Sequence, residues 1–140
     1  MNRYVLDSYA LIALQLDEPG ADQVWQLLSD NQNEHWMTEV NLGEVFYKLV
    51  RERDRDLADE VIEETIALPI RFVDADRALV MEAALIKATY PLSYADCFAA
   101  ALARRIRARV LTGDEEFEML EQVGLIKVEW LPTKRRTRRS

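Results

Sequence analysis

The chain has 140 residues, of which 49% are hydrophobic, and carries a formal net charge of −7. This length and composition predict one globular domain and exclude a disordered or fibrous chain. No apolar run approaches membrane-spanning length and no signal-peptide pattern is visible, so we expect no membrane association. A single cysteine, Cys97, excludes an internal disulfide and a cysteine-based zinc site, and it favours a cytoplasmic location.

The charge is unevenly distributed along the chain. Five basic residues and no acidic ones lie between residues 134 and 140, which leaves 13 basic and 25 acidic residues in the body. We therefore expect a domain over residues 1–132 and a basic tail over residues 133–140. An acidic body does not attract a polyanion by its overall field, so any binding of nucleic acid requires a local basic surface, a bound cation, or both.

The first expected element is a strand at Arg3–Leu6, which is rich in β-forming residues and is ended by Asp7 and Ser8. Such a run is typical of a strand buried on both faces in the middle of a parallel sheet. The other expected strands lie at residues 35–38, 70–73, 109–111 and 126–131. Helices are expected at residues 9–16, 21–29, 42–49, 57–68, 93–106 and 115–122. A further helix is expected to begin at Asp74 or Asp76 and to run to residue 88.

Strands separated by helical stretches predict a parallel sheet with right-handed crossovers. The last strand alternates apolar and polar residues, which is typical of a strand at the edge of a sheet. The predicted fold class is therefore α/β, a three-layer α/β/α domain with a central, mainly parallel sheet of four to five strands.

Four acids lie at the boundaries between these elements. Asp7 and Asp114 each follow a strand directly, whereas Glu44 and Asp96 each fit the first turn of a helix. Each acid also has a structural explanation: Asp7 and Asp114 fit N-caps, and Glu44 and Asp96 fit the third helical position of capping boxes that begin at Asn41 and Ser93. The hydrophobic stripe of its helix leaves Glu44 on the solvent side.

Taken together, the four acids predict a metal site. In a parallel sheet, the carboxyl ends of strands and the starts of the following helices lie at one edge, where ligands bind. Clustered carboxylates repel one another, and one would take up a proton unless a cation were bound. Ligands that offer only oxygen favour Mg²⁺ or Mn²⁺, and such an ion can polarise a phosphodiester and generate hydroxide from water.

Each acid lies in a short motif. These motifs are Tyr4-Val5-Leu6-Asp7-Ser8, Thr38 followed six residues later by Glu44, Leu92 to Ala101 around Asp96, and Val110-Leu111-Thr112-Gly113-Asp114-Glu115-Glu116-Phe117. In this order and spacing they resemble the PIN-domain family of metal-dependent ribonucleases, and within it the VapC-type toxins. The resemblance runs from Arg3 to about Leu131.

The resemblance implies a metal-dependent endoribonuclease, the toxin of a type II toxin–antitoxin pair. It implies Asp7, Glu44, Asp96 and Asp114 as the catalytic metal ligands, with Thr112 and Ser8 in support. The family often has Asp at the position of Glu116, so the part of Glu116 in a second metal site stays open. The implied partners are an RNA substrate, a small cognate antitoxin that covers the acidic site, and a second copy of the chain in a homodimer.

Two basic clusters are candidate RNA contacts. Arg104 and Arg105 end a helix, where cations also suit the helix dipole. Lys134, Arg135 and Arg136 belong to the tail, which reads equally well as a solubilising end or as a surface that holds phosphates.

Two other functions fit parts of the pattern. A receiver-like phosphoacceptor signalling domain also has a doubly wound sheet and an acidic pocket, but it requires paired acids after the first strand and a lysine after the last strand. Here Asp7 stands alone, and Lys127 begins its strand. A non-catalytic binding module with a PIN-like fold is the second alternative, and the presence of all four acids argues against it. A phosphatase of the haloacid dehalogenase type requires a second aspartate two residues after the first. Tyr9 occupies that position here, which argues against this class.

Overall fold

The computed structural model describes residues 2–133. The predicted tail contacts Lys134, Arg135 and Arg136 lie outside the described residues, and the proposed domain boundary at residue 132 stays a prediction. Within residues 2–133, we find no helix that combines the length and the apolar composition needed to cross a membrane.

The described chain alternates strands and helices. The strands are β1 (Arg3–Leu6), β2 (Glu34–Thr38), β3 (Arg71–Val73), β4 (Arg109–Thr112) and β5 (Lys127–Trp130). The helices are α1 (Ser8–Gln15), α2 (Ala21–Ser29), α3 (Glu39–Glu52), α4 (Arg55–Ile66), α5 (Arg77–Thr89), α6 (Tyr94–Ile106) and α7 (Glu118–Gln122), with a 3-10 turn at Glu115–Phe117 before α7.

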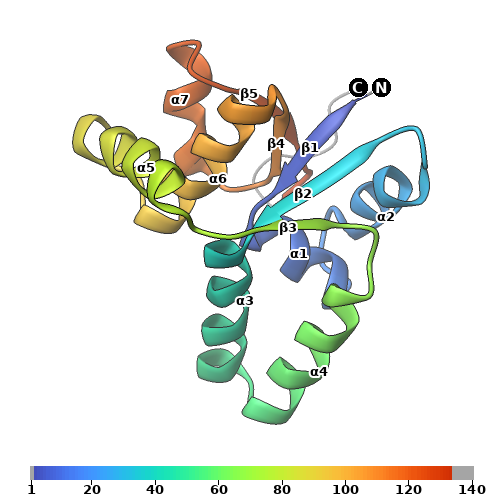
Figure 1. Cartoon of the computed structure of the whole chain (residues 1–140). Helices are drawn as coiled ribbons and strands as arrows, with labels where there is room; N and C mark the ends of the chain where they lie inside the picture. Colours follow the sequence, from blue (N-terminus) through green and yellow to red (C-terminus); the bar gives the residue numbers. More distant parts are fainter. Residues whose placement is uncertain (1, 134–140) are drawn as a thin grey trace.

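The five strands form one parallel sheet in the order β3-β2-β1-β4-β5 (Figure 1). The chain builds outward from β1 through β2 to β3, and then returns to the other side of β1 with β4. The strand order therefore reverses between β1 and β4, and the carboxyl ends of these two strands flank the crevice where open α/β sheets bind ligands.

Helices cover both faces of the sheet, which gives three layers (Figure 1). Successive residues of β1 point to opposite faces: Val5 packs in a core with α5, α6 and α7, whereas Tyr4 and Leu6 pack in a second core with α1 to α4. β4 repeats this division with Val110 and Leu111. A central strand buried on both faces needs the continuous apolar run that its sequence shows.

The predicted fold class is confirmed, with five strands that are all parallel. β1 is central and β5 is an edge strand, as the sequence predicts. The predicted start of the third helix was wrong, because α3 begins at Glu39 and its N-cap is Thr38, whose Oγ1 accepts a hydrogen bond from the amide of Asn41 at 3.0 Å. Glu44 therefore lies in the second turn of α3, beyond the reach of a capping box.

Two glycines provide a test of the backbone conformation. Gly43 lies inside α3, where an added Cβ would meet open space, so Gly43→Ala should stabilise the fold by about 0.5–1 kcal/mol. Gly20 has a φ of +98° and an added Cβ would lie 3.1 Å from Leu131, so Gly20→Ala should destabilise it by more than about 1 kcal/mol. Urea denaturation of both variants measures the two changes, and the opposite order would contradict the backbone described above.

Candidate metal centre

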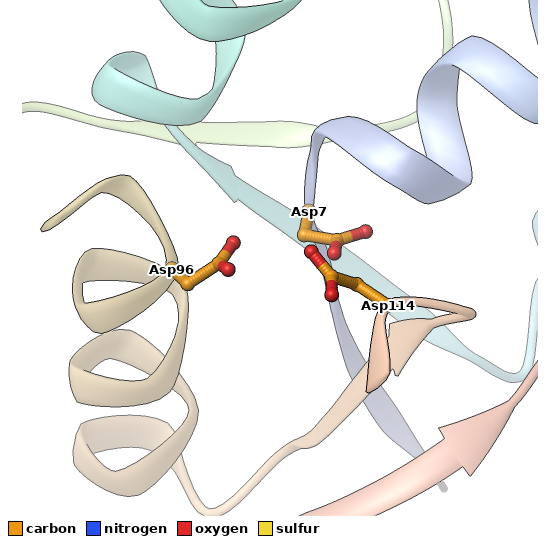
Figure 2. Close-up of side chains that lie close together, drawn as sticks. All are labelled: Asp7, Asp96 and Asp114. Atoms are coloured by element: carbon orange, nitrogen blue, oxygen red, sulfur yellow. The ribbon is translucent and has the colours of Figure 1, made fainter. Parts of the chain in front are cut away.

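Three aspartates from distant parts of the sequence meet at the carboxyl end of the sheet. Asp7 follows β1, Asp114 follows β4, and Asp96 lies in the first turn of α6. Figure 2 shows their carboxylates pointing toward one another, and one oxygen from each lies within 4.8 Å of the other two. The crevice between β1 and β4 thus contains three of the four acids that the sequence predicts to meet.

Local capping interactions hold each aspartate in place. Asp7 is the N-cap of α1, and its Oδ1 accepts a hydrogen bond from the amide of Ala10 at 3.0 Å. Asp114 caps the 3-10 turn, where its Oδ1 accepts from the amide of Glu116 at 3.0 Å. Asp96 is the third residue of α6, whose N-cap is Ser93. Capping thus engages one oxygen each of Asp7 and Asp114, whereas Asp96 is positioned through its backbone amide, which donates to Oγ of Ser93.

Thr112, the last residue of β4, joins two of these acids. Its fully buried hydroxyl donates a hydrogen bond to Oδ2 of Asp7 at 2.5 Å and accepts one from the amide of Asp114 at 2.9 Å. One hydroxyl thus links the ends of the two strands that flank the crevice. The supporting role that the resemblance implies for Thr112 stays a prediction, to which this contact gives a physical basis.

Glu44 lies beside the three aspartates without belonging to their group. Its side chain is buried, although the hydrophobic stripe of its helix predicts exposure, and its negative charge contributes to the raised pKa values of Asp7 and Asp96. Its Oε1 is buried and has no hydrogen-bond partner within the described part of the chain. Such an atom is unfavourable unless it finds a ligand, because a buried unpaired oxygen loses its hydration.

Lys48 is a neighbour of the site that the sequence reasoning missed. Its Nζ lies 3.5 Å from Oε2 of Glu44 and donates to Oγ of buried Ser8 at 3.4 Å. The i, i+4 spacing of Glu44 and Lys48 on one helix was the available signal. Burial lowers the pKa of Lys48, but the negative charges around it, chiefly that of Glu44, prevail and raise it above the usual value.

The remaining predicted residues lie near opposite ends of α6. Glu116 is exposed, and its Oε1 accepts a hydrogen bond from the amide of Ser93 at 3.0 Å, which places it near the start of α6. Arg104 and Arg105 lie toward the other end of α6. There Arg104 donates to the carbonyl of Leu125, and Arg105 pairs with acids on or just before α5.

Burial sets the electrostatics of the metal-free site. It raises the pKa of Asp7 to about 7, although the hydrogen bonds from Thr112 and Ala10 oppose this, and it raises the pKa of Asp96 to about 8. The charges of the neighbouring acids are a smaller part of both increases, and Asp114 contributes to each. The protein therefore holds protons near neutral pH that a free aspartate would release.

The donor set suits a hard divalent cation. Asp7, Asp96 and Asp114 offer carboxylate oxygens close enough to share one ion, and Glu44 adds an unpaired buried oxygen beside them. Oxygen-only ligands of this kind favour Mg²⁺ or Mn²⁺, and two positive charges would offset the burial and repulsion that otherwise favour protonated acids.

The raised pKa values predict how the metal-free protein responds to pH. Asp7 and Asp96 have pKa values of about 7 and 8 in the folded state, against 3.8 in the unfolded chain. As pH falls from about 8.5 to about 6.5, the folded state takes up protons that the unfolded chain does not bind. The free energy of unfolding should therefore rise, by up to about 1.4 kcal/mol per pH unit for each proton.

Urea denaturation in the presence of a chelator measures this effect above about pH 6.5. Below that pH the buried His35, whose pKa is lowered by burial, acts in the opposite direction. The variant Asp96→Asn removes one buried charge, so it should be more stable than the wild type at about pH 8.5 and depend less on pH. Equal stability of the two proteins, with no rise on acidification, would contradict the described electrostatics.

Comparisons with known proteins agree with the fold described above. A chain of VapC20 from Mycobacterium tuberculosis, a toxin that cleaves the sarcin-ricin loop, has 16% identity and a TM-score of 0.74, with 92% of this chain and 99% of that chain covered. A chain of VapBC2 from Rickettsia felis, bound to promoter DNA, has 12% identity and a TM-score of 0.71, with 92% and 98% covered.

A third structure, VapBC-5 of the VapBC family of toxin–antitoxin systems from M. tuberculosis, has 17% identity and a TM-score of 0.66, with 93% and 99% covered. At these identities the likeness concerns the fold. No curated protein sequence matches the chain. The sequence model of the PIN domain matches residues 4–122, which include all four predicted acids. This chain belongs to the PIN domain family.

Proposed function

We propose that this protein is a metal-dependent endoribonuclease that hydrolyses phosphodiester bonds in RNA. The observation that carries the proposal is the convergence of Asp7, Asp96 and Asp114 at the crevice between β1 and β4. Membership of the PIN domain family supports nuclease chemistry at this site. The resemblance of the four motifs to VapC-type toxins supports RNA as the substrate.

The proposed mechanism assigns each residue a task. Asp7, Asp96 and Asp114 would hold Mg²⁺ or Mn²⁺, and Glu44 would add its unpaired Oε1. The bound ion would polarise the phosphodiester and lower the pKa of a water that attacks it. Thr112 keeps Asp7 oriented toward the crevice through the hydrogen bond to its Oδ2. No nucleophile from the protein is required.

We further propose that the protein is the toxin of a type II toxin–antitoxin pair and acts in the cytoplasm. Its structural neighbours include chains of VapBC toxin–antitoxin systems, which support an antitoxin partner. By the same resemblance, a small cognate antitoxin would cover the acidic site, and two copies of the chain would form a homodimer. The receiver-like alternative receives no support from the family match.

The central test is RNA cleavage by purified protein. Asp7→Asn and Asp96→Asn should each reduce cleavage in Mg²⁺ or Mn²⁺ by more than about 100-fold, because even outer-shell partners of a metal contribute about 10- to 100-fold. Gel analysis of a labelled single-stranded RNA measures the rates. Asp22→Asn is the matched control, since it removes the same charge from an exposed position on α2.

The control should cleave at the wild-type rate, and circular dichroism should show that all three variants are folded. Undiminished cleavage by both pure site variants would exclude this site as the origin of the activity. Titration of Mn²⁺ by calorimetry then separates an enzyme from a non-catalytic binding module. Metal binding that Asp96→Asn weakens, without any RNA cleavage by the wild type, would favour the binding module.

The toxin hypothesis is tested in cells. Brief induction of the wild type should arrest growth and generate new RNA ends, which sequencing of cellular RNA would locate. The same induction of Asp7→Ala should do neither. Growth arrest by both proteins would show that the effect does not depend on the carboxylate site.

A further inference from the structure

Lys48 brings a positive charge to the mouth of an otherwise acidic site. Its Nζ lies 3.5 Å from Oε2 of Glu44, whose other oxygen is buried and unpaired. On its other side Nζ donates to Oγ of Ser8, the residue that follows Asp7. The Lys48 side chain is 38% exposed and that of Glu44 is 7% exposed. The ammonium group therefore lies between Glu44 and the solvent.

No other basic side chain in residues 2–133 forms an ion pair with the acids of this site. The remaining ion pairs of the described chain join Arg3, Arg55, Arg71, Arg105 and Arg109 to acids elsewhere. The predicted RNA contacts Arg104 and Arg105 lie toward the other end of α6 and are engaged by a carbonyl and by acids of their own. Lys48 is thus the cation of the described chain that forms an ion pair with an acid of the site, whereas the ammonium of Lys87 donates to the carbonyl of Leu92.

The charge of the substrate favours such a cation. Around a bound divalent ion, ionised Asp7, Glu44, Asp96 and Asp114 would carry more negative charge than the ion neutralises, and every RNA phosphate adds another. Attraction between a polyanion and a protein depends on local positive charge, which the acidic body of this chain does not supply. A partly exposed ammonium beside the carboxylates supplies it where the reacting phosphate must lie.

We infer that Lys48 is a substrate-binding residue that contacts an RNA phosphate at the mouth of the carboxylate site. The inference rests on the proposed ribonuclease function. Its pairing with Glu44 and Ser8 keeps the flexible side chain at the rim of the crevice, so part of the conformational entropy of binding is already lost in the free protein. A contact with phosphate adds affinity without choosing a sequence.

The test measures binding in the Asp96→Asn background, so that RNA remains intact. Three variants are added to this background: Lys48→Met, Lys48→Arg and Lys127→Met. Lys127 begins β5 at the edge of the sheet, so its loss changes the net charge equally without touching the site. Fluorescence anisotropy of a labelled single-stranded RNA in Mg²⁺ gives Kd over a series of salt concentrations.

Lys48→Met should weaken binding about tenfold at low salt and reduce the slope of log Kd against log salt by about 0.7, the value for one phosphate contact on a single strand. Lys48→Arg keeps the charge and should keep most of the affinity and the slope. Lys127→Met should match the background protein. A slope for Lys48→Met equal to that of Lys127→Met would overturn the inference.

Metal binding separates this role from a purely structural one. If Lys48 only positioned Glu44, Lys48→Met in the otherwise wild-type chain would weaken Mn²⁺ binding in calorimetry and leave the salt slope unchanged. That result would overturn the inference. We expect Mn²⁺ affinity to be equal or higher, because the substitution removes a positive charge near the ion.

The failure of this inference can be told apart from failure of the function. Cleavage of RNA by the wild type, together with an unchanged slope for Lys48→Met, would leave the ribonuclease function standing and remove Lys48 from it. Absence of both RNA binding by the Asp96→Asn protein and RNA cleavage by the wild type would overturn both.

Discussion

Burial of ionisable carboxylates beside one another is the constraint on which the structure of the site depends. Asp7 and Asp96 are almost fully buried, and Asp114 lies within ligand distance of both. Burying charge without a partner is costly, and the metal-free protein responds by holding protons near neutral pH. These buried carboxylates lower the stability of the metal-free fold. A bound divalent cation would offset that loss.

The topology explains why residues more than about 100 positions apart share one site. Asp7 and Asp114 follow the two strands between which the strand order reverses, and the hydroxyl of Thr112 joins them. Asp7 and Asp114 also cap the elements that follow, so each residue has a structural role beside the one proposed at the metal site. A substitution that preserves the cap, such as Asp to Asn, can therefore keep the fold while it removes the charge.

The sequence predicts the parts of this structure that depend on short-range patterns. The apolar run of β1 predicts a central strand, and the positions of Asp7 and Asp114 at strand ends predict their meeting, because parallel strands share one edge. The burial of Glu44 could not be predicted in this way. Hydrophobic periodicity reports only the face that a helix turns to the main core, whereas Glu44 is buried beside the three aspartates. The position of Lys48, four residues after Glu44 on α3, is by contrast a sequence signal for their contact.

We propose that the carboxylates converge in order to hold a divalent ion. The most direct measurement is anomalous diffraction from crystals of the protein soaked in Mn²⁺. We predict a peak between Asp7, Asp96 and Asp114. Its distances to the carboxylate oxygens should be about 2.1 Å, which is typical of small hard cations. A saturating soak that gives no peak at these three side chains would contradict the account.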